Sequence, residues 1–245
     1  MQPRNIEQEF SDNERKYAYA FDQVLRRYMV RTLTPYLVAG NALEIGCFEG
    51  DFTKLLLTIF ADVTVIDASM ELISRAKHAT GARAQFICSR IEDVTPDRAF
   101  DNIFLVHTLE HFDERASALR RVASFLGPHG RLFVVVPNAN AASRQIAVKM
   151  GLISHNCAVT EAEFKHGHRV TYSLDTLERD AKTAGLVIER QGGVFFKPLA
   201  NFQFDKAIEQ NLVSPEYLEG CYQLGFQYPD LCASIFLVCS SRSTV

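Results

Sequence analysis

Residues 43–50, Leu-Glu-Ile-Gly-Cys-Phe-Glu-Gly, decide the fold of this chain. Apolar residues lead into Glu44, Gly46 and Gly50 bracket a short turn, and residues 52–60 have the pattern of a helix. In a strand–turn–helix unit, glycines let backbone amides come close to a ligand because they carry no side chain. The stretch therefore predicts the first strand and helix of a nucleoside-binding α/β unit.

A second apolar strand, residues 63–66, ends at Asp67. A carboxylate at this place can accept hydrogen bonds from both hydroxyls of a ribose. The spacing disfavours a dinucleotide, because Phe48 and Asp51 stand where that fingerprint needs glycines. The Asp51 carboxylate would also repel a pyrophosphate at the start of the helix. The pocket therefore suits a nucleoside that bears a cation better than one that bears phosphates.

These residues resemble the first motif of the class I S-adenosylmethionine-dependent methyltransferases, acid-x-Gly-x-Gly-x-Gly, with Phe48 replacing the middle glycine. The resemblance spans residues 40–195. Residues 99–112 are similar to the family's fourth strand and following loop, and residues 130–138 to its fifth strand. The resemblance implies an α/β, Rossmann-like, doubly wound, seven-stranded sheet whose last strand is antiparallel and lies at the edge, with helical lid insertions. It also implies S-adenosyl-L-methionine as the cofactor and S-adenosyl-L-homocysteine as the product.

Strand and helix patterns alternate along the chain, which indicates a parallel sheet wrapped by helices. We expect one domain over residues 1–245, with a helical cap at 1–40 and substrate-side lid excursions at 138–170 and 198–229. The expected strands are 42–45, 63–66, 84–88, 101–106, 131–136, 186–190 and 234–239, the expected helices 12–39, 52–60, 70–79, 113–126 and 173–184, and Gly192–Gly193 is expected to turn or kink.

The resemblance also implies which residues contact the cofactor. Asp67 would bind the ribose diol through two charge-assisted hydrogen bonds, and Glu44 would attract the ammonium of the methionyl part. Tyr19 and Arg90 are also expected to contact the cofactor. The alternative for Tyr19 is an aromatic helix face packed on the sheet, and the alternative for Arg90 is a solvated surface charge. The remaining expected contacts are Gly46, Cys47, Gly50, Ala68, Ser69, Ile91 and His107.

Methyl transfer needs an aligned nucleophile, methyl carbon and sulfur, and a base where the acceptor is a hydroxyl or a protonated amine. Our candidate catalytic residues are His107, His111 and His168. His107 follows the fourth strand at the carboxyl edge of the sheet, where ligands bind. The alternative for His107 is a structural histidine that bridges strand and helix, and for His111 it is capping or packing at the start of the next helix.

His107-x-x-Glu110-His111 resembles the Glu-x-x-Glu-His segment that ligates a divalent metal in ubiquinone-type O-methyltransferases and RNA-end 2′-O-methyltransferases. Residues 165–168, Lys-His-Gly-His, could supply a further imidazole. Many similar proteins carry Leu-Glu-His without a metal, so from the sequence we predict none.

The acceptor is expected to lie against the lid excursions. Asn138, Asn140 and Arg144 follow the fifth strand directly, and Arg144 suits a bidentate contact with a carboxylate or phosphate. His166 and Phe196 complete the expected acceptor contacts. The phenylalanines around Phe196 could instead simply cover the sheet.

Composition favours a small-molecule enzyme of the cytoplasm. The net charge of −3 and the lack of a basic run argue against nucleic acid as an obligatory partner. No apolar run approaches the length of a membrane span, and the first residues lack the apolar stretch of a secretory signal. The six cysteines form no Cys-x-x-Cys pair, which favours free thiols in a reducing compartment.

We therefore predict methyl transfer to an oxygen or nitrogen of a small-molecule acceptor, such as a natural-product, quinone-like or sugar intermediate. One alternative is an RNA-end or protein methyltransferase, which the mildly acidic chain disfavours. An alternative of another class is a non-catalytic nucleoside-binding sensor module. A homodimer is compatible with each of these predictions.

Overall fold

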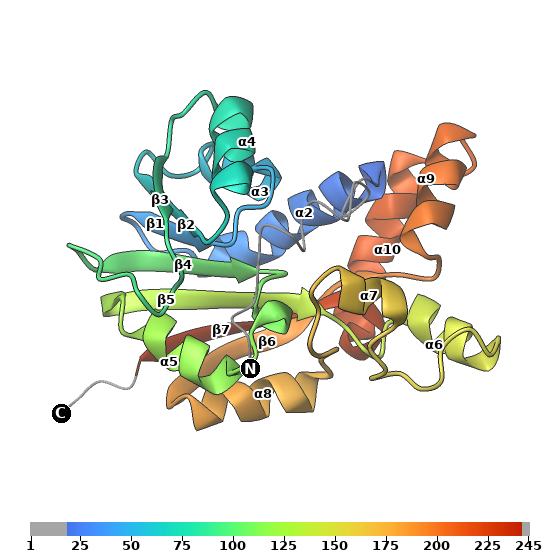
Figure 1. Cartoon of the computed structure of the whole chain (residues 1–245). Coiled ribbons are helices and arrows are strands. Elements are labelled where there is room, and N and C mark those ends of the chain that lie inside the picture. The colour runs from blue at the N-terminus through green and yellow to red at the C-terminus, as the bar shows by residue number, and fades with distance from the viewer. Residues whose placement is uncertain (1–18, 242–245) are drawn as a thin grey trace.

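The computed structural model describes residues 19–241. These residues form a seven-stranded sheet in the order β3-β2-β1-β4-β5-β7-β6, with helices on both faces (Figure 1). The strands are β1 (Ala42–Ile45), β2 (Val63–Asp67), β3 (Gln85–Cys88), β4 (Phe100–Val106), β5 (Leu126–Pro137), β6 (Leu186–Phe196) and β7 (Cys232–Ser241). The pairs among β1 to β5 are parallel, and β7 is antiparallel to both β5 and β6. The predicted Rossmann-like fold is confirmed.

One detail of the sheet differs from the prediction. The last strand, β7, is antiparallel as expected, but it lies between β5 and β6, so β6 forms the edge. Every residue of β7 from Cys232 to Cys239 is buried. Such a continuous apolar run is typical of a strand covered on both faces and paired on both sides.

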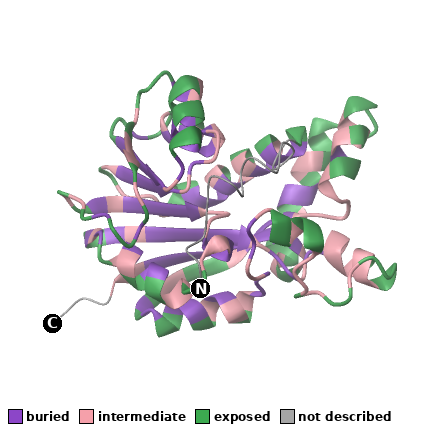
Figure 2. Ribbon diagram, viewed as in Figure 1, coloured by how far each residue is buried: buried purple, intermediate pink, exposed green. Residues whose placement is uncertain are grey.

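The central strands separate two apolar layers. Along β4, Phe104 faces the layer that contains Phe133 and α2 (Ala20–Leu33), whereas Leu105 faces the layer that contains Leu132 and Tyr172. Successive side chains of a strand point to opposite faces, which explains the alternation. Figure 2 shows the resulting buried centre of the sheet, with the exposed residues gathered on the helices.

The helices of the two predicted excursions gather beyond the carboxyl ends of β4 and β5 (Figure 1). The first excursion contains α6 (Ala142–Lys149) and α7 (Glu161–Lys165), and the second contains α9 (Asn201–Glu209) and α10 (Pro215–Gln227). The other helices and 3-10 turns are α3 (Asp51–Leu56), α4 (Met70–Thr80), α5 (Arg115–Ala123), α8 (Leu174–Thr183), η1 (Thr34–Tyr36), η2 (Leu109–His111) and η3 (Pro229–Leu231). Both excursions thus overhang the edge of the sheet where ligands bind in this fold.

The described part of the predicted 1–40 cap consists of α2 and η1, and the rest of that cap lies outside the described residues. No helix in residues 19–241 is long and apolar enough to cross a membrane.

Two local predictions were wrong. Gly192 and Gly193 lie inside β6, paired with β7, and make no turn. A Cβ at Gly192 would come within 2.9 Å of the Phe236 ring, so glycine serves close packing there. Glu110 and His111 do not begin the next helix; they belong to the separate turn η2, and α5 starts at Arg115.

Candidate functional site

A cavity of about 410 Å³ opens at the carboxyl ends of β1, β2 and β4. Small-molecule sites commonly measure roughly 300–1,000 Å³. Most of the expected cofactor contacts line this cavity together with the candidate base His111: Glu44, Gly46, Cys47, Asp67, Ala68, Arg90, Ile91 and His107. The sequence-based prediction therefore located a real concavity.

The glycine-rich turn keeps its shape despite the missing middle glycine. Gly46, Phe48 and Gly50 all have left-handed backbone, with φ of 81°, 47° and 85°. Phe48 therefore adopts the conformation that a glycine would prefer, at a cost of about 1–2 kcal/mol. At Gly46 a side chain is excluded outright, because a Cβ would lie 2.6 Å from the Thr108 hydroxyl oxygen.

Asp67 organises the turn and faces the cavity. Its Oδ2 accepts a hydrogen bond from the Cys47 amide at 2.9 Å, and its Oδ1 accepts one from the Ser69 amide at 2.9 Å. The Cys47 thiol also donates to Oδ2, at 3.6 Å, and a carboxylate has about four acceptor positions, so capacity remains for a ribose hydroxyl. Burial raises the pKa of Asp67, while these amide bonds oppose the rise.

Glu44 is buried beneath the same turn. Its Oε2 accepts a hydrogen bond from the Thr53 hydroxyl at 2.6 Å, and burial raises its pKa to about 8. A cation in the cavity would favour the ionised carboxylate. The charge of Glu44 thus responds to what the cavity holds.

His107 directly follows β4 and has a left-handed backbone, with φ of 51°. Its Nε2 lies 2.9 Å from the Ser234 hydroxyl, and burial lowers its pKa to about 3. The ring is therefore neutral at physiological pH and attracts a proton weakly. Its assignment as a base stays a prediction, and the geometry suits hydrogen bonding better.

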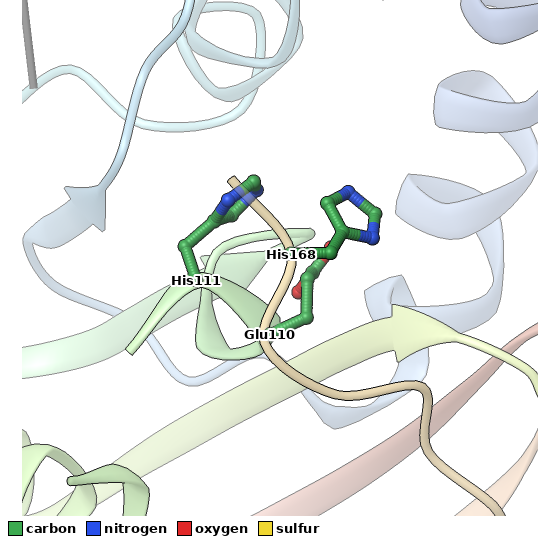
Figure 3. Close-up of side chains that lie close together, drawn as sticks. All are labelled: Glu110, His111 and His168. Atoms are coloured by element: carbon green, nitrogen blue, oxygen red, sulfur yellow. The ribbon is translucent and has the colours of Figure 1, made fainter. Parts of the chain in front are cut away.

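Glu110, His111 and His168 converge beside this cavity (Figure 3). Each offers one ligand atom, and these atoms lie within 4.8 Å of one another. The rings of His111 and His168 meet edge to face with centroids 4.8 Å apart. Two imidazoles and one carboxylate are a donor set that suits a divalent transition metal, so these residues fit such an ion.

The predicted acceptor contacts do not line the cavity. The buried Asn138 donates hydrogen bonds to the Asp230 and Cys232 carbonyls, and its Oδ1 accepts one from the Asn140 amide. Arg144 donates to Glu163 at 2.6 Å and to two carbonyls within its own excursion. Asn138 therefore fastens the start of the first excursion to η3 and β7, and Arg144 holds that excursion together.

The remaining predicted residues also lie outside the cavity lining. Tyr19 is 39% exposed at the start of α2, His166 ends α7, and Phe196 lies against Tyr228. Asn140 accepts a hydrogen bond from Asn156. Gly50 ends the glycine-rich turn at the start of α3, and Ser69 caps α4. His168 belongs to the cluster of Figure 3.

The sequence analysis missed several polar cavity residues, among them Asp22 and Arg26. Both come from α2, one helical turn apart, and Arg26 lies 3.8 Å from the Asp51 carboxylate. The sequence signals an apolar stripe on this helix but not which polar residues flank the cavity. A cationic side chain that lines the cavity suits a ligand carboxylate.

Comparison with known proteins agrees with this geometry. Residues 13–191 match a family model described as a methyltransferase domain. The chain is 26% identical over 196 residues to the ubiquinone biosynthesis O-methyltransferase of Xanthomonas axonopodis pv. citri, covering 78% of this chain and 80% of that protein. It is 29% identical over 192 residues to the protein of the same name from Aeromonas salmonicida, covering 74% and 79%.

Solved structures show the same fold. A possible histamine N-methyltransferase from Thermotoga maritima superposes with a TM-score of 0.64 at 16% identity, covering 96% of this chain and 99% of that one. The N-methyltransferase NodS from Bradyrhizobium japonicum, in complex with S-adenosyl-L-homocysteine, superposes with a TM-score of 0.59 at 16% identity, covering 97% and 96%. The chain therefore belongs to the methyltransferase domain family and is a class I S-adenosylmethionine-dependent methyltransferase.

Proposed function

We propose that this methyltransferase transfers the methyl group to a hydroxyl oxygen of a small, quinone-like aromatic acceptor. The observation that carries the proposal is the Glu110, His111 and His168 cluster, whose His111 also lines the cofactor cavity. The relatives named ubiquinone biosynthesis O-methyltransferase, matched over most of their length, support the same acceptor class.

In this proposal the cofactor lies along the carboxyl ends of β1, β2 and β4. Asp67 binds the ribose diol, Ile91 packs on the adenine, and Arg26 pairs with the methionyl carboxylate. Glu44 balances the ammonium. The sulfonium supplies an activated methyl group, so the protein has to align the acceptor and exclude water.

The cluster of Figure 3 would hold a divalent cation next to the acceptor. Such a cation polarises a coordinated hydroxyl and lowers its pKa. His107, neutral and bonded to Ser234, would form part of the wall between the acceptor and the sheet.

The proposal is tested by incubating the purified chain with labelled S-adenosylmethionine and three acceptor panels: phenols and catechols, primary amines, and short RNA. We expect O-methylated products from the catechols and none from RNA. Labelled amines without labelled catechols would contradict the oxygen acceptor, and labelled RNA would favour the RNA-end alternative.

A further inference from the structure

The amino end of α2 is anchored firmly to the second lid excursion. The Asp205 carboxylate of α9 accepts hydrogen bonds from the Ala20 amide at 3.2 Å and the Phe21 amide at 2.8 Å. The Phe21 ring stacks on Phe204 with centroids 4.2 Å apart and an interplanar angle of 5°. Asp22, the next residue, is therefore held in one place relative to α9.

A chain of hydrogen bonds orients the Asp22 carboxylate. Its Oδ1 accepts a hydrogen bond from Asn201 Nδ2 at 2.8 Å, and Asn201 Oδ1 accepts one from the Lys197 ammonium at 2.7 Å. The ammonium therefore sets the direction of the Asn201 amide, because it can only donate. Asp22 lies in α2, Asn201 in α9 and Lys197 in the loop after β6, so these residues are distant in sequence and meet only in the folded protein.

Asp22 is a cavity-lining residue whose second carboxylate oxygen, Oδ2, has no partner among the described residues. Asp22 is only 7% exposed and lines the same cavity as Gly46 and His107. Its Oδ2 is buried and has no hydrogen-bond partner among residues 19–241. A buried carboxylate oxygen without a donor is costly, on the order of 1–3 kcal/mol or more. A ligand donor would remove this cost.

We propose that Asp22 binds the acceptor hydroxyl through Oδ2 and takes its proton during methyl transfer. The inference rests on the proposed oxygen acceptor. As the acceptor oxygen forms its bond to the methyl carbon, the carbon–sulfur bond breaks and its electron pair neutralises the sulfonium. The hydroxyl proton passes to Asp22 Oδ2 and leaves to solvent after product release. Asn201 and Lys197 are positioning residues in this scheme.

The electrostatic surroundings suit this role. Burial raises the pKa of Asp22 above its ordinary value, and nearby Asp205 adds to the rise, while Arg26 and Lys197 oppose it. A base works best when its pKa lies near the working pH. Because the base must be ionised, turnover should rise with pH through the pKa of Asp22. His107, whose pKa is lowered to about 3, is less suited to the task.

A purely structural role is the competing explanation, because an acidic residue in the first turn stabilises a helix through its dipole. Asp22→Asn separates the two, since it keeps an acceptor for Asn201 but cannot take a proton. The matched control is Asp175→Asn, which removes the same charge from the first turn of another helix, α8, outside the cavity lining.

The experiment measures kcat for wild type and both variants on catechols of graded hydroxyl pKa, with S-adenosylhomocysteine affinity measured by calorimetry. For catechol, we expect Asp22→Asn to lower kcat at least about 100-fold, with cofactor affinity within about threefold of wild type. The loss should shrink as the acceptor hydroxyl becomes more acidic, and the rise of kcat with pH should disappear. Asp175→Asn should stay within about threefold.

The outcomes distinguish the inference from the proposed function. If wild type methylates catechols and Asp22→Asn does so equally well, the inference is overturned and the oxygen acceptor stands. A loss of cofactor affinity in Asp22→Asn would place Asp22 in the cofactor site and overturn the inference. If wild type methylates no hydroxyl, the proposed function fails. The inference is then decided by catechol binding to the S-adenosylhomocysteine complex. Binding at least tenfold weaker in Asp22→Asn than in wild type would support the contact, and equal binding would overturn it.

Discussion

The Nε2 of His107 lies 2.9 Å from the hydroxyl of Ser234, which joins the end of β4 to β7 across the intervening strand β5. The His107 amide also donates to the Val135 carbonyl of β5, so backbone and side chain both fasten this residue. A left-handed φ of 51° is thereby held in place.

Acid should weaken the fold through His107. Its pKa is about 3 in the folded state against an ordinary value of 6.5, so between these values the unfolded chain binds the proton and the folded chain does not. The free energy of unfolding should therefore fall as pH drops below 6.5, by at most about 1.4 kcal/mol per pH unit from this group. Urea unfolding at several pH values measures the slope.

His107→Gln should reduce this slope, because glutamine can bond Ser234 without titrating. The exposed His129 provides the control: His129→Gln should keep the wild-type slope. Equal slopes in wild type and His107→Gln would contradict the lowered pKa.

Asp67→Ala should weaken S-adenosylhomocysteine binding roughly 100-fold, on the order of two lost charged hydrogen bonds. Calorimetry measures the affinity. Asp62 precedes the same strand at its opposite end and pairs with Arg98, so Asp62→Asn is a matched control that should bind normally. Unchanged binding by folded Asp67→Ala would show that the ribose lies elsewhere.

Gly46→Ala should destabilise the protein more than Gly81→Ala. Both glycines have left-handed φ, 81° and 64°, so both substitutions cost about 1 kcal/mol of backbone strain. At Gly46 the added Cβ would also lie 2.6 Å from the Thr108 hydroxyl oxygen, whereas at Gly81 it meets nothing within 4 Å. We expect a further 1–3 kcal/mol or so at Gly46, measured by urea unfolding. Equal losses would refute the close approach.

Equilibrium dialysis should show that the protein binds about one Zn²⁺ or Mn²⁺ ion at the cluster of Glu110, His111 and His168. His168→Ala should weaken metal binding at least about tenfold, because it removes one of three ligands, and should leave S-adenosylhomocysteine binding intact. His155, exposed on the lid and bonded to Ser154, supplies the control variant His155→Ala. Metal retention by His168→Ala equal to wild type would place the ion elsewhere.

Short-range patterns predicted the residues of the glycine-rich turn and the acid at the end of β2, which line the cavity. Gly46 and Asp67 act through the turn and strand in which they stand, so their neighbours in the chain signal their place. The observed strands overlap the predicted ones, because a strand that is buried on both faces of a parallel sheet has a continuous apolar run that shows in the sequence. Boundaries and the Gly192–Gly193 pair were less predictable, because the contact with Phe236 that requires glycine is distant in sequence.

The contacts of the lid residues could not be predicted in this way. Asn138 and Arg144 look like ligand contacts in the sequence, yet Asn138 bonds to the Asp230 and Cys232 carbonyls and Arg144 bonds to Glu163 of its own excursion. His168 meets His111, and Asp22 meets Asn201, across long stretches of chain.

Local patterns in the sequence were enough to predict the order of the strands along the chain, the glycine-rich turn and the acid at the end of β2, because periodicity, φ preference and strand ends are local properties. Which polar residues share the cavity follows from the tertiary structure. The direction of a side chain on α2 or the lid is set by packing against elements far along the chain, and no local pattern encodes that contact.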